Sequence, residues 1–94
     1  MNVNEINNGE KIKYAVEGNK ITFGDDELTI NLEKYEKDTE VEINICTDSE
    51  GLLLTTLAER YVAVIIIPAR MYVNDVAVPF KIDNVILNLF ALEG

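Results

Sequence analysis

The sequence predicts a small all-β domain, an antiparallel sandwich or barrel of about seven short strands. Three observations lead to this prediction. Polar and apolar residues alternate in several short runs, as in strands with one buried face. Turn-forming residues separate these runs at close spacing. One longer run, Tyr61–Ile67, is apolar throughout, which is typical of a strand buried on both faces.

The clearest local element is a β-hairpin over residues 11–23. Gly18-Asn19 suits a two-residue type II′ turn between two alternating runs, because glycine readily takes the first position of such a turn. The expected cross-strand pairs are Glu17 with Lys20, Val16 with Ile21, and Tyr14 with Phe23. Two one-sided strands follow, with these apolar faces: Leu28, Ile30 and Leu32 in the first, and Val41, Ile43 and Ile45 in the second.

The second half of the chain contains the most apolar strands. Asn74-Asp75 suits another tight hairpin turn, with Val73 opposite Val76. The last apolar run, Val85–Leu92, is the expected neighbour of Tyr61–Ile67. Residues 52–60 fit either a strand or a helix, and we expect a strand or irregular start followed by one short helical turn near residues 55–60.

The chain is short enough for one folded unit. Residues 1–10 are polar and rich in asparagine, so we expect a flexible N-terminal arm followed by a single β domain over residues 11–94. The start shows neither a basic nor an apolar leader segment. With a single cysteine, Cys46, no intrachain disulfide can form, which fits a reducing compartment. We therefore expect a cytoplasmic protein.

Charge is unevenly distributed along the chain, whose net charge is −9. Residues 1–50 carry thirteen acidic residues and five lysines, whereas residues 51–94 carry four acidic and three basic residues. This balance argues against nucleic acid and against anionic membranes as partners. The first half resembles a solvated surface, and the second half resembles a core, or a core with an interface.

No residue set in the sequence indicates catalysis. Histidine is absent, which removes the commonest general base, and no phosphate-binding or dinucleotide-binding glycine motif occurs. Asp25-Asp26-Glu27 is interpreted as a solvated acidic turn, and Asp48 as part of a polar β-turn in which its side chain bonds local amides. Cys46 is interpreted as a structural, partly buried thiol. We expect no enzyme activity, cofactor, metal or small-molecule substrate.

Five residues form the candidate interface. Arg60 and Arg70 are the only arginines and bracket the apolar strand. Each can anchor a partner's carboxylate or form a salt bridge to the acidic half of the same chain. Asn88 is the one polar residue within the final apolar run, and Tyr72 and Phe90 complete the set.

Tyr61–Arg70 together with Val85–Leu92 resembles small uncharacterised proteins encoded among the structural genes of phages and prophages of Gram-positive bacteria. The resemblance covers about the last third of the chain and involves core-strand residues. It implies a virion or assembly component, with no catalytic residues to carry over.

The surplus of apolar strand in the second half predicts a non-catalytic structural, assembly or protein-interaction module that self-associates or docks on a larger complex. The alternative is an acidic binding or inhibitor protein that docks on a basic partner by charge complementarity.

Overall fold

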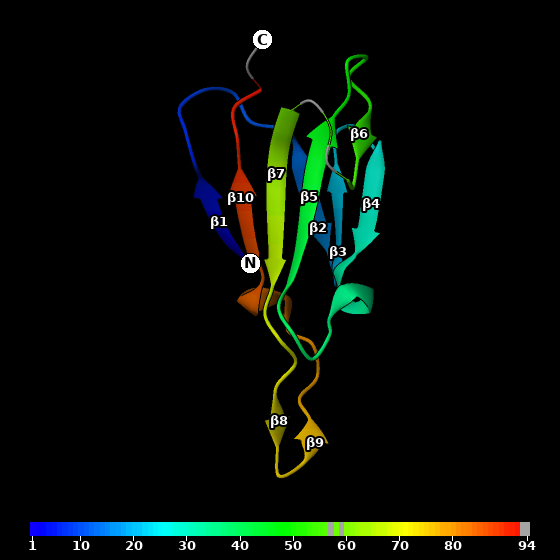
Figure 1. The fold of residues 1–94 in the computed structure, drawn as a ribbon, viewed down its shortest axis with the longest axis vertical. Helices are drawn as coiled ribbons and strands as arrows, with labels where there is room; N and C mark the ends of the chain where they lie inside the picture. The colour runs from blue at the N-terminus through cyan, green and yellow to red at the C-terminus, as the bar shows by residue number, and fades with distance from the viewer. Residues whose placement is uncertain (57, 59, 93–94) are drawn as a thin grey trace.

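The computed structural model describes residues 1–56, 58 and 60–92 of the chain. Within these residues the chain forms ten strands and two short 3-10 helices, in a molecule with principal extents of 50 × 22 × 22 Å (Figure 1). The strands are β1 (Asn2–Glu5), β2 (Tyr14–Glu17), β3 (Lys20–Phe23), β4 (Leu28–Asn31), β5 (Val41–Thr47), β6 (Leu53–Leu54), β7 (Arg60–Ile67), β8 (Tyr72–Val73), β9 (Val76–Ala77) and β10 (Ile86–Leu89). The 3-10 helices are η1 (Leu32–Tyr35) and η2 (Ile82–Asn84).

Eight of these strands form two sheets that pack as a sandwich. One sheet has the order β1-β10-β7-β5-β6, and the other has the order β2-β3-β4. Apolar side chains of both sheets form one buried core, and burying each large one is worth roughly 1.5–3 kcal/mol. The largest fully buried side chains are Ile21, Phe23, Leu32, Ile45, Ile65, Ile67 and Leu87. The all-β prediction is therefore confirmed.

Strand β7 lies in the middle of the larger sheet, between β10 and β5. The predicted pairing of the two apolar runs, residues 61–67 and 85–92, is confirmed in antiparallel register. The expectation that β7 is buried on both faces is wrong for one face. Ile65 and Ile67 point into the core and are fully buried, whereas Val64 and Ile66 lie on the outer face and are half-buried.

The two predicted hairpins form with the predicted pairs. Val16 pairs with Ile21 and Tyr14 with Phe23 across the first turn. Gly18 has a φ of 60°, the left-handed conformation that the first position of a type II′ turn requires. In the second hairpin Val73 pairs with Val76.

The N-terminal residues form a strand where the composition predicts a loose arm. Strand β1 pairs with β10 in parallel, the one parallel pairing between the strands of the described chain. The Asn2 amide donates a hydrogen bond to the Val85 carbonyl (2.8 Å), and the Ile6 amide donates to the Leu89 carbonyl (2.9 Å). All four β1 residues are exposed, so backbone pairing holds this strand and no apolar alternation marks it in the sequence.

The strand number is higher than predicted because β1 and several two-residue strands add to the longer ones. Leu53–Leu54 is a strand that pairs with β5, which agrees with the predicted strand start there. The helical turn predicted near residues 55–60 includes positions 57 and 59, which lie outside the described residues.

Candidate functional site: a projecting apolar hairpin

Hairpin β8–β9 extends beyond the end of the sandwich along the long axis of the molecule and belongs to neither sheet (Figure 1). Its turn residues, Asn74 and Asp75, have φ values of 52° and 64°. Asparagine and aspartate tolerate this left-handed conformation, and two such residues in succession make the tight turn that suits twisted strands. A hydrogen bond of 2.8 Å from the Val78 amide to the Met71 carbonyl continues the pairing toward the sandwich.

One face of this hairpin is entirely aliphatic. Opposed residues of an antiparallel pair share a face, and so do residues two apart on one strand. The residues Met71, Val73, Val76 and Val78 therefore form one surface, the aliphatic stripe. Met71, Val73 and Val76 are 56%, 61% and 67% exposed. An isolated two-stranded hairpin is only marginally stable in water, so a contact that covers this stripe would stabilise the hairpin.

The opposite face of the hairpin is anchored to the loop after η1. The Tyr72 hydroxyl donates a hydrogen bond to Asp38 Oδ1 (2.7 Å), and Arg70 Nη1 donates to the same oxygen (3.1 Å). Arg70 Nη2 donates to the Glu36 carbonyl (3.0 Å), and the Arg70 amide donates to the Lys37 carbonyl (2.7 Å). These contacts fix the direction of the hairpin, and Met71, Val73 and Val76 of the aliphatic stripe stay exposed.

Arg70 is the centre of this anchor. Hydrogen bonding with the Tyr72 side chain raises the pKa of Arg70 above its ordinary value, and Asp38 and Glu36 act in the same direction. Of the two interpretations of Arg70, a partner's anchor or an ion pair with the acidic half, the structure shows the second. Its guanidinium contacts carboxylates of both Glu36 (3.5 Å) and Asp38.

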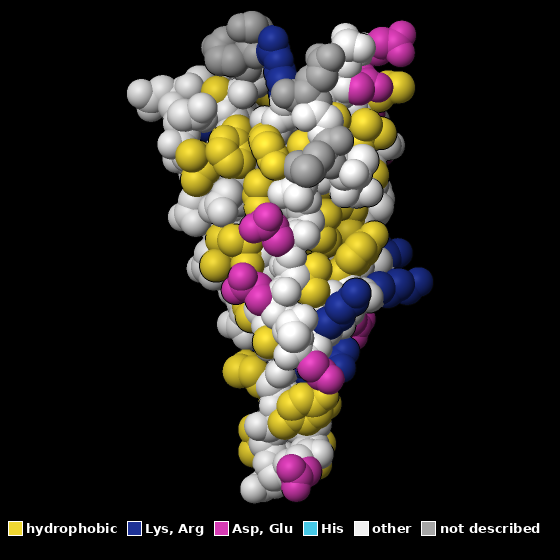
Figure 2. Space-filling model, viewed as in Figure 1, with side chains coloured by type: hydrophobic (Ala, Val, Ile, Leu, Met, Phe, Trp, Pro, Cys, Tyr) yellow, Lys and Arg dark blue, Asp and Glu magenta, His cyan; other side chains and the backbone are white. Residues whose placement is uncertain are grey.

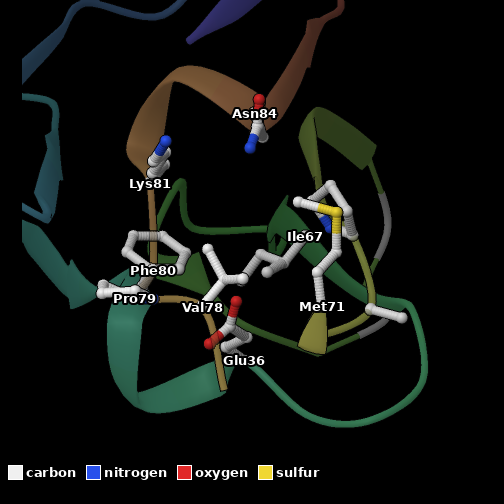
Figure 3. Close-up of a pocket in the computed structure, with 10 residues that line it drawn as sticks. Glu36, Ile67, Met71, Val78, Pro79, Phe80, Lys81 and Asn84 are labelled. Carbon is white, nitrogen blue, oxygen red and sulfur yellow. The ribbon is translucent and has the colours of Figure 1, made fainter. Parts of the chain in front are cut away.

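A small hollow lies at the base of the hairpin, beside Met71 and Val78 of the stripe (Figure 3). Its other lining residues are Glu36, Ile67, Pro68, Ala69, Pro79, Phe80, Lys81 and Asn84. Its volume of about 20 Å³ admits a methyl group or a water molecule, far below the several hundred Å³ of a typical ligand pocket. The hollow is therefore large enough only for the tip of a side chain or for one water molecule.

The other candidate interface residues lie on the five-stranded sheet, away from the hairpin. Asn88 accepts a hydrogen bond from Asn4 Nδ2 (3.0 Å), and the Phe90 ring lies 6.1 Å from that of Tyr61 in a tilted pair. Arg60 is exposed at the start of β7, the end opposite the hairpin. Figure 2 shows this side of the molecule, where hydrophobic side chains alternate with polar and acidic ones over the sheet. The structure thus divides the five predicted residues between two surfaces.

Sequence reasoning included Tyr72 but missed the stripe itself. The alternation of Met71, Val73, Val76 and Val78 around Asn74-Asp75 was available as a signal. These valines project away from the sandwich and stay uncovered because Arg70 and Tyr72 contact the distant residue Asp38. No local pattern in the sequence indicates those contacts.

A wider, open cleft of about 340 Å³ lies on the three-stranded sheet, lined by Lys13, Tyr14, Ala15, Glu17, Thr22, Gly24, Asp25 and Asp26. Lys13 Nζ donates a hydrogen bond to Asp25 Oδ1 (2.8 Å). This bond and the Lys13 charge lower the pKa of Asp25, and the same bond and the Asp25 charge raise the pKa of Lys13. Both side chains are well exposed, so the cleft presents a solvated ion pair and lacks the desolvation that catalytic carboxylates use.

The surroundings of the two remaining candidate residues, Cys46 and Asp48, fit structural roles. Cys46 is fully buried, and Asp48 Oδ1 accepts hydrogen bonds from the amides of Glu50 (2.9 Å) and Leu52 (3.0 Å), as the polar-turn interpretation predicts. Among the described residues, no group of three or more His, Cys, Asp or Glu side chains is placed to hold a metal ion.

Comparison with known proteins gives no relative: no protein-family model, no curated protein and no solved structure matches the chain. In the part of the chain that the structure describes, no helix is both long and apolar enough to cross a membrane. The projecting hairpin lies outside both sheets of the sandwich and exposes an aliphatic face, and it is the candidate interaction site.

Proposed function

We propose that the protein is a non-catalytic assembly module that associates with further copies of itself through hairpin β8–β9. The observation that supports this proposal is the exposure of Met71, Val73 and Val76 on one face of an anchored, projecting element. Transfer of one such side chain from water to an apolar contact is worth roughly 1.5–3 kcal/mol. In a monomer these side chains stay in contact with water, so this free energy is gained only when copies associate through the stripe.

The charge distribution is compatible with contact between copies through the hairpin. Two chains of net charge −9 repel each other, and most of the acidic residues lie in residues 1–50. Between Arg70 and Lys81, by contrast, Asp75 is the only charged residue. Contact through this segment therefore brings together a weakly charged part of two acidic molecules.

The resemblance of the C-terminal third to phage and prophage structural proteins supports the same kind of role. We propose a virion or assembly component, in which repeated contacts between copies are the function. The hairpin lies within that third, between the two runs Tyr61–Arg70 and Val85–Leu92.

The test is the oligomeric state of a stripe variant, Val73→Thr/Val76→Thr. Threonine keeps the shape and the strand preference of valine while making the stripe polar. Sedimentation velocity over rising concentration should show the wild type exceeding its monomer mass of 10.6 kDa, and the variant remaining monomeric.

Val16→Thr is the matched control, because Val16 is an exposed strand valine on β2, in the other sheet. It should associate as the wild type does. A wild type that stays monomeric at millimolar concentration would overturn the proposal, and so would a stripe variant that associates as strongly as the wild type.

A further inference from the structure

The tip and the base of the hairpin carry opposite charges. Asp75 lies in the turn at the tip, and Lys81 lines the hollow at the base together with Met71 and Val78 of the stripe (Figure 3). Among the described residues, neither Asp75 nor Lys81 forms an ion pair. The stripe thus runs from an unpaired acid at one end to an unpaired base and an apolar hollow at the other.

We infer that two copies pair through antiparallel hairpins, each tip seated at the base of the other; this rests on the self-association proposed above. The contact is two-fold symmetric, so every interaction occurs twice. The two aliphatic stripes face each other. The tip valines, Val73 and Val76, lie over the partner's hollow, and Asp75 lies against Lys81 of the partner subunit.

Charge decides between the antiparallel and the parallel arrangement of the hairpins. A parallel pair places the two Asp75 carboxylates together and the two Lys81 ammonium groups together, so like charges repel at both ends. An antiparallel pair turns both contacts into attractions. It also places the two acidic sandwiches at opposite ends of the joined hairpins, where salt screens their repulsion over a Debye length of about 8 Å.

Glu36 is the one acidic residue that lines the hollow. Its carboxylate lies 3.5 Å from Arg70 Nε, and its side chain is only 15% exposed. Arg70 also contacts Asp38, so it neutralises only part of the combined charge of these two carboxylates. Lys81 is exposed and has no ion-pair partner among the described residues, so it is the attractive charge for an approaching Asp75.

The experiment is a double-mutant cycle in which the effect of Asp75→Asn on dimerisation should have opposite signs in two backgrounds. Asp75→Asn removes the tip charge and keeps a residue that tolerates the left-handed turn. In the wild-type background it should weaken dimerisation, by roughly two- to five-fold for each exposed pair. In the Lys81→Glu background the same change should strengthen dimerisation, because it now removes a repulsion. Sedimentation at low salt measures all four dissociation constants.

Arg60→Glu is the matched control for Lys81→Glu, since it makes the same charge reversal at the opposite end of β7. In the Arg60→Glu background Asp75→Asn should weaken dimerisation as it does in the wild type, with no reversal of sign, and thermal melts should show all variants folded. If the stripe variant abolishes the dimer but Asp75→Asn has the same effect in both backgrounds, the antiparallel pairing is overturned. The proposed function is then still supported. A monomeric wild type overturns both.

Discussion

The Tyr72 hydroxyl donates a hydrogen bond of 2.7 Å to Oδ1 of Asp38, a residue 34 positions earlier in the chain. Arg70 shares that oxygen. A single carboxylate oxygen thus joins two residues at the start of the hairpin segment to a loop in the acidic half of the chain. This contact sets the direction in which the aliphatic stripe points.

Removing the Tyr72 hydroxyl should loosen the hairpin without unfolding the sandwich. We expect Tyr72→Phe to lower the free energy of unfolding by about 1 kcal/mol, the usual loss for one hydrogen bond. Amide hydrogen exchange should become faster in β8 and β9 and stay unchanged in β7. Tyr35→Phe is the control, because Tyr35 is exposed on η1 and its hydroxyl makes no hydrogen bond among the described residues. Equal effects of the two changes would contradict the anchoring role.

The two faces of β7 should respond differently to the same small truncation. Ile65→Val removes a methylene from the core and should lower the free energy of unfolding by about 0.5–1.5 kcal/mol. Ile66→Val, one residue later on the half-buried outer face, should cost less than about 0.5 kcal/mol. Urea denaturation of both variants measures the difference. A larger loss for Ile66→Val would mean that the outer face is covered in solution.

Acid should titrate Asp25 at a lower pH than an ordinary aspartate. Lys13 holds the pKa of Asp25 below its ordinary value of 3.8, so Lys13→Ala should raise it toward that value. Because the folded-state pKa is the lower one, the pair's stabilisation is present above pH 3.8 and is lost as the pH falls through the folded-state pKa. Carboxyl chemical shifts followed by NMR through the acid range measure this. An unchanged Asp25 titration in Lys13→Ala would show that the pair does not form in solution.

Local patterns were sufficient to predict the hairpins and the identity of the core strands. Turn chemistry at Gly18 and Asn74-Asp75 fixes the register of adjacent strands, so the pairs across both turns follow from the sequence. The apolar runs also identify two adjacent strands of the larger sheet, because residues 61–67 and 85–92 pair as predicted.

Features that depend on backbone pairing between distant residues were not predictable. Strand β1 has four exposed residues and no alternation of buried ones, so its pairing with β10 is invisible in composition. The partner of Arg70 depended likewise on where the loop after η1 lies. The alternative of an acidic binding protein stays a prediction that rests on charge alone. The interface role of Arg60, Asn88 and Phe90 also stays a prediction.

The parallel pairing of β1 with β10 has a consequence for how the chain folds. Among the described strands, the first in chain order pairs with the last, and more than eighty residues separate the hydrogen-bonded partners Asn4 and Asn88. Closing so long a loop carries a large entropic cost, and topologies rich in distant contacts fold slowly. During synthesis residues 2–5 emerge long before β10, so they stay without this partner until residues 86–89 have emerged.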